Sequence, residues 1–136
     1  MNASLVRLYL PALVVFLVLD ALWLGVVARG FYREQLGDLM RPDVRWGAAL
    51  LFYLLFIAAV LVFVVLPALE RGSLAYAIGM GAFFGLVAYA TYDLTNLAVL
   101  RGFPAKVAVV DMAWGAAVTA GTSAAAFLLA SKVGIR

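Results

Sequence analysis

Cysteine and histidine are both absent from the 136 residues of the sequence. Their absence excludes disulfides, zinc sites of the usual Cys/His kind, haem ligation by histidine, and every Ser-His or Cys-His nucleophile. Carboxylates, phenols, hydroxyls, amides and the backbone remain for any chemistry. We therefore expect no cofactor and no metal site.

Charged residues are also scarce, at 12% of the chain against about 25% in an average soluble domain. The net charge of +3 is too small and too scattered to indicate binding to nucleic acid. Basic residues in such a chain have another use, since they set the topology of membrane proteins. We expect no nucleic-acid partner.

Apolar residues, in contrast, make up 68% of the sequence, where roughly 45–50% is usual. A soluble fold of this size buries only about two-thirds of the surface that its unfolded chain exposes. The excess apolar surface must therefore face lipid, and the sequence predicts an integral membrane protein.

Four apolar stretches are each long enough to cross the roughly 30 Å hydrocarbon core of a bilayer. They are Leu8–Ala28, Trp46–Leu69, Leu74–Leu100 and Val107–Ala130. Lipid offers no hydrogen-bond partner to an unpaired backbone group, so such spans form helices. The sequence predicts an all-α, up-down bundle of four transmembrane helices, forming one transmembrane domain over residues 1–136.

The first stretch also resembles a signal peptide, because Arg7 precedes an apolar run. No small-x-small cleavage site follows it, Asp20 interrupts the apolar run, and the run continues to Ala28. A retained helix is the better interpretation.

The connection from Arg29 to Arg45 is the only long polar segment. Its apolar residues recur at helical spacing, which predicts a short interfacial helix that ends before Pro42. These residues are Tyr32, Leu36, Leu39 and Met40. An irregular polar loop is the alternative. The connections between the first and second stretches and between the third and fourth stretches lie on the same side of the membrane and hold six basic residues. The opposite side holds four, so the positive-inside rule places both termini outside the cytoplasm.

Small residues dominate the last stretch. From Gly115 to Ala126 every residue except Val118 is Gly, Ala, Ser or Thr, and the third stretch offers a matching Gly81-x-x-x-Gly85. Such residues let two helix backbones approach closely. We expect the fourth helix to be the most enclosed, although a small-residue surface can also line a cavity.

Three acidic residues, Asp20, Asp93 and Asp111, lie inside the predicted spans. A carboxylate in hydrocarbon costs a few kcal/mol, so each is a candidate functional residue. In an up-down bundle all three lie roughly 6 to 12 Å below the same membrane interface, at about 1.5 Å per residue.

Aromatic and amide residues accompany these acids. Trp23 and Trp114 each follow an aspartate by three residues, which predicts that each indole N–H lies beside the carboxylate of its own helix. Tyr89 and Asn96 share a helix face with Asp93, which we take as the centre of the site. The whole candidate ligand-binding cluster is Asp20, Trp23, Tyr53, Tyr89, Asp93, Asn96, Asp111 and Trp114.

Three interpretations of this cluster stay open. The first is a structural network that holds the helices in register. The second is a site that binds or moves a proton, a small cation or a polar metabolite. The third is a pair of carboxylates that act on lipid with a hard cation such as Mg²⁺. We favour binding or translocation of a small polar or lipidic ligand, with protonation as the switch. A non-catalytic accessory or scaffold protein of a lipid-modifying system and a small membrane enzyme are the alternatives. Expected partners are membrane lipids and either a second copy or a membrane enzyme.

The sequence resembles an uncharacterised family of small bacterial four-span membrane proteins. The elements that carry the resemblance are Tyr92-Asp93-Leu94-Thr95-Asn96, Asp20-x-x-Trp23, Phe31-Tyr32, Phe52-Tyr53 and Asp111-x-x-Trp114-Gly115. The resemblance covers nearly the whole chain. It implies a multi-pass protein of the bacterial inner (cytoplasmic) membrane, with a lipid-related role and no established activity.

The predicted topology can be tested with single cysteines, because the chain has none of its own. We expect Gly37→Cys and Ser73→Cys to lie on opposite sides of the membrane, so an impermeant maleimide added from one side labels only one of them. Equal labelling of both from one side contradicts four spans. Labelling of Gly37→Cys alone from the periplasm reverses the orientation and leaves the four spans intact.

Overall fold

A computed structural model describes residues 3–134 of the chain, and within that range every regular element is a helix. Four of the helices are long and apolar enough to span a membrane. They cover Leu5–Val27, Trp46–Arg71, Leu74–Val99 and Ala105–Lys132. The predicted all-α membrane bundle is confirmed, and each predicted span lies within three residues of an observed one.

Two of the spans contain a wider, π-helical turn. The first span runs through α1 (Ala3–Leu22) into η1 (Trp23–Val27), and the second through α3 (Trp46–Val60), η3 (Leu61–Val65) and α4 (Leu66–Arg71). The third and fourth spans are the continuous helices α5 (Leu74–Val99) and α6 (Ala105–Lys132).

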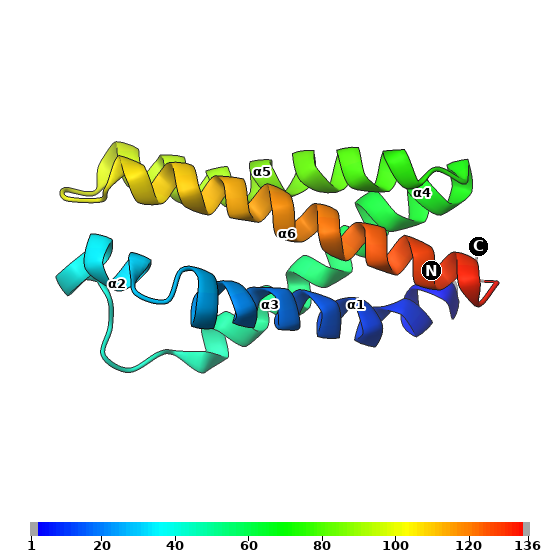
Figure 1. Ribbon diagram of the computed structural model, residues 1–136, viewed down its shortest axis with the longest axis horizontal. Coiled ribbons are helices and arrows are strands. Elements are labelled where there is room, and N and C mark those ends of the chain that lie inside the picture. The colour runs from blue at the N-terminus through cyan, green and yellow to red at the C-terminus, as the bar shows by residue number, and fades with distance from the viewer. Residues whose placement is uncertain (1–2, 135–136) are drawn as a thin grey trace.

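The chain runs up and down through the bundle (Figure 1), with both termini at one end. At the other end lie the α5–α6 connection and the two short helices α2 (Phe31–Leu36) and η2 (Gly37–Leu39). This end, the α2 end of the bundle, is where the three intramembrane aspartates were expected.

A short helix in the first connection is confirmed, but the apolar residues that it buries differ from those predicted. Phe31, Tyr32 and Leu36 pack against Phe103 of the α5–α6 connection and against Val107 and Ala108 at the start of the fourth span. Leu39 and Met40 are exposed instead. The apolar face of α2 packs against the start of α6, and α2 therefore covers this end of the bundle.

The helices α5 and α6 form the closest pair in the bundle. A Cβ atom built on Gly85 would overlap the carbonyl oxygen of Gly115, and one built on Gly81 would lie 2.8 Å from the Ser123 hydroxyl. Only glycine leaves room for this approach. The expectation that small residues bring these two helices together is confirmed, and the span of α6 is the most buried of the four.

The second span meets this pair mainly through its later part. Close backbone contacts with α5 and α6 come from η3 and α4, whereas α3 lies close to α1. The core in this region is formed by large apolar side chains such as Phe16, Ile57, Val60 and Val64. Towards the α2 end, α3 therefore diverges from α5, and side chains rather than backbone must fill the space between them.

The close approach of α5 and α6 predicts that Gly85→Ala destabilises the protein. We expect a loss of about 1–3 kcal/mol from overpacking, measured by thermal unfolding in detergent with circular dichroism. Gly79→Ala is the matched control, because it lies on the same helix with no atom within 4 Å of its added Cβ. An unchanged stability in Gly85→Ala would contradict the observed approach of the two helices.

Candidate functional site

A cavity of about 350 Å³ lies between the spans towards the α2 end of the bundle. Residues from all four spans and from α2 line it. They are Asp20, Trp23, Leu24, Tyr32, Ala49, Phe52, Tyr53, Ala88, Tyr89, Tyr92, Asp111 and Trp114. Six of the eight predicted cluster residues are thus brought together around one space.

The carboxylate of Asp20 connects three of the spans. It is 8% exposed and accepts two hydrogen bonds from other helices. The Tyr53 hydroxyl of α3 donates to Oδ2 at 2.8 Å, and the Trp114 indole N–H of α6 donates to Oδ1 at 3.1 Å. Both carboxylate oxygens are therefore satisfied by side chains that also line the cavity.

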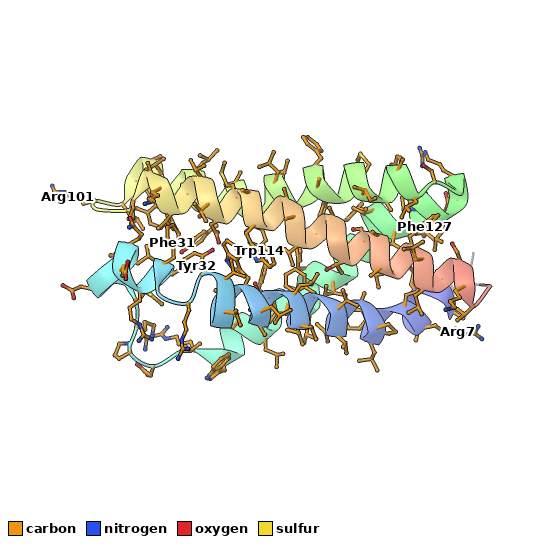
Figure 2. All side chains as sticks on the ribbon, viewed as in Figure 1. Arg7, Phe31, Tyr32, Arg101, Trp114 and Phe127 are labelled. Carbon is orange, nitrogen blue, oxygen red and sulfur yellow. The ribbon has the colours of Figure 1, made fainter. Side chains whose placement is uncertain are left out.

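A second chain of hydrogen bonds begins at the other indole. Trp23 donates its N–H to the Tyr32 hydroxyl at 2.9 Å, and that hydroxyl donates to Asp111 Oδ1 at 2.8 Å. Figure 2 shows Tyr32 and Phe31 extending from α2 towards the α5–α6 pair and Trp114. Burial raises the pKa of the Tyr32 phenol, so it stays protonated at neutral pH and keeps its proton for donation to Asp111.

The two tryptophans do not pair with the aspartates of their own helices, and that prediction is wrong. Their rings stack in parallel, with centroids 4.7 Å apart and 5° between the planes. In this arrangement Trp114 donates to Asp20, which belongs to the first span, and Trp23 donates to Tyr32. The stacked pair therefore joins the first and fourth spans instead of supporting each acid within its own helix.

Asp93 and Asn96 do not line the cavity. Asp93 is completely buried, and within residues 3–134 neither of its carboxyl oxygens has a hydrogen-bond partner. Asp93 interacts with Asp111, which does line the cavity, while Asn96 is half-buried one turn further along α5. The hydrogen-bond network is thus centred on Asp20 and Asp111 rather than on Asp93.

Sequence reasoning missed several residues of the cavity wall. The sequence pattern places Tyr32 on the apolar face of an interfacial helix, and Phe52 and Tyr92 lie outside the predicted cluster. Each belongs to one of the aromatic elements that carry the family resemblance, which was the available signal. Periodicity could not find Tyr32, because a tyrosine suits both an apolar face and a hydrogen-bonding role.

The chemistry of the wall is aromatic and acidic. No lysine or arginine is among the described residues that line the cavity, and Arg101 projects from the outer end of the bundle in Figure 2. Among the residues that the structure describes, no group of three or more acidic side chains is arranged to hold a metal ion.

Comparisons with known proteins identify a family. No curated protein and no solved structure is significantly similar to the chain. A family model described as "Predicted membrane protein (DUF2177)" matches residues 5–128, which include the whole of the first three spans and most of the fourth. The chain belongs to this family of predicted membrane proteins.

Proposed function

We propose that the protein binds a small polar or lipidic ligand in the cavity at the α2 end of the bundle. The observation that carries the proposal is the cavity itself, which combines two hydrogen-bonded carboxylates with an otherwise aromatic and apolar wall. Ligand sites of proteins are commonly concave, about 300–1,000 Å³ in volume, and lined by apolar side chains with a few polar groups. The cavity has this size and this composition.

Access from the bilayer is supported by the exposure of the wall. Leu24, Phe52 and Tyr92 line the cavity and are also 47%, 43% and 53% exposed on the outside of the bundle. Phe52 and Tyr92 lie about 9 to 11 Å inside the ends of their spans, at about 1.5 Å per residue. A ligand with an apolar part can therefore enter sideways between α3 and α5, where the two helices diverge.

Binding is better supported than translocation. Below the cavity, Phe16 packs edge-on against Phe56 with ring centroids 5.5 Å apart, and Phe56 stacks on Phe84 at 5.8 Å. These rings come from three spans and lie about one helical turn further from the α2 end than the wall residues Asp20, Tyr53 and Ala88. A ligand that entered from the α2 end would have to displace them to cross the membrane.

The proposed location is the bacterial inner membrane, with membrane lipids as partners. Bacterial outer membranes hold β-barrels, whereas bundles of apolar helices are built into the inner membrane. The resemblance to small bacterial four-span proteins supports the same location. A scaffold role remains the second candidate, because Asp20 joins three spans through its two hydrogen bonds.

Filling the cavity separates ligand binding from a scaffold role. We expect Ala49→Phe, which places a ring in the cavity, to lower the retention of lipid about tenfold, equivalent to about 1.4 kcal/mol. The measurement is native mass spectrometry after reconstitution in vesicles of phosphatidylethanolamine, phosphatidylglycerol and cardiolipin. The hydrogen-bond network is left intact, so thermal stability should change little.

Ala48→Phe is the matched control, since Ala48 is exposed on the same helix and lies outside the cavity wall. It should retain lipid like the parent protein. Equal retention by both variants, or no retained lipid in the parent, would favour the scaffold role.

A further inference from the structure

We propose that the ligand carries an organic ammonium group, which binds between Asp20, Asp111 and the aromatic rings of the cavity. This inference rests on the proposed ligand-binding function and names the chemical class of the ligand. Three observations support it: the sign of the charge in the wall, the number of aromatic side chains that line the cavity, and the apolar, lipid-facing edge.

The charges that face the cavity are all acidic. Asp20 and Asp111 line it, and the buried Asp93, which is outside the lining, interacts with Asp111. Within the described part of the chain, the one salt bridge joins Arg41 and Asp43 in the first connection, far along the chain from any of these acids. A carboxylate held away from bulk water interacts strongly with a nearby cation. The wall therefore favours a cationic ligand and disfavours an anionic one.

Aromatic side chains form most of the remaining wall. They are Trp23, Tyr32, Phe52, Tyr53, Tyr89, Tyr92 and Trp114. The faces of such rings attract cations, and aromatic cages of this kind bind quaternary ammonium and methylated amine groups. Two carboxylates together with several rings suit a bulky, weakly hydrated cation.

A metal ion fits the same wall poorly. Mg²⁺ and Ca²⁺ require about six or more oxygen ligands in a compact shell. Both oxygens of Asp20 and one oxygen of Asp111 already accept hydrogen bonds from Tyr or Trp side chains. A cavity of about 350 Å³ is also far larger than one metal ion needs, whereas a substituted ammonium group would fill a large part of it.

The exposed rim indicates where the rest of the ligand goes. Leu24 and Phe52 give the cavity an apolar edge that is continuous with the lipid-facing surface. An ammonium group held by Asp20 and Asp111 would leave an attached apolar chain at this edge. A lipid with an amine headgroup and a free alkylamine share this chemistry.

Intrinsic tryptophan fluorescence gives a direct binding assay. The chain has three tryptophans; two stack in the cavity wall, and Trp46 is 71% exposed at the start of the second span. The variant Trp46→Phe therefore reports from the cavity alone. The protein in dodecyl maltoside micelles is titrated with choline, with dodecyltrimethylammonium, and with 3,3-dimethyl-1-butanol, a neutral analogue of choline with the same shape.

We expect both cations to change the fluorescence saturably and the neutral analogue to bind at least about tenfold more weakly. Adding Asp111→Asn should weaken the binding of both cations by a similar factor and leave the binding of the neutral analogue unchanged. Adding Ala49→Phe, which touches neither acid, should remove the response. Tighter binding of dodecyltrimethylammonium than of choline would identify the ligand as a lipid-like amine. Equal binding of the two would identify it as a water-soluble amine.

Equal affinity for choline and its neutral analogue would overturn the ammonium assignment, as would cation binding that Asp111→Asn leaves unchanged. If lipid retention still depends on residue 49 in that case, the proposed binding function survives and only the ligand class is wrong. If retention is independent of residue 49, the binding function fails as well.

Discussion

The structure depends on the hydrogen bonds that two intramembrane carboxylates, Asp20 and Asp111, accept from side chains of other helices. Asp20 accepts from Tyr53 of the second span and Trp114 of the fourth. Those donors belong to two other spans and bond to different oxygens of Asp20, which fixes the relative positions of three helices. Tyr32 donates to Asp111, and this draws α2 against the end of the bundle.

The cavity follows from unequal helix spacing. Glycines at positions 81, 85 and 115 let α5 and α6 approach so closely that a Cβ atom added at any of them would clash with the facing helix. The second span joins this pair through η3 and α4, and its earlier part diverges. Large aromatic side chains from α3 and α5 occupy the widening space only partly, so the acids and rings at the α2 end surround a cavity. The close contact between α5 and α6 and the divergence of α3 from α5 together produce the cavity.

The fold was predictable because it rests on signals that a sequence states directly. Span length, the glycine spacing of 81 and 85, and the run of small residues from Gly115 to Ala126 each act through local sequence. The depth of the acids followed from counting residues along helices. The hydrogen-bond acceptors of Trp23 and Trp114 could not be predicted in this way, because the stacking of their rings between two helices determines which acceptors the indole N–H groups reach. The role of Tyr32 depends on how a connection folds back, which periodicity does not specify.

We propose that the acids and aromatic rings at the α2 end form a site that a ligand occupies. An experimental structure of the protein in lipid nanodiscs tests it most directly. We expect elongated density with one end between Asp20 and Asp111 and the other leaving the bundle between Phe52 and Tyr92. A structure in which α3 closes against α5 and side chains fill this space would contradict the claim and leave the cluster as a link between helices.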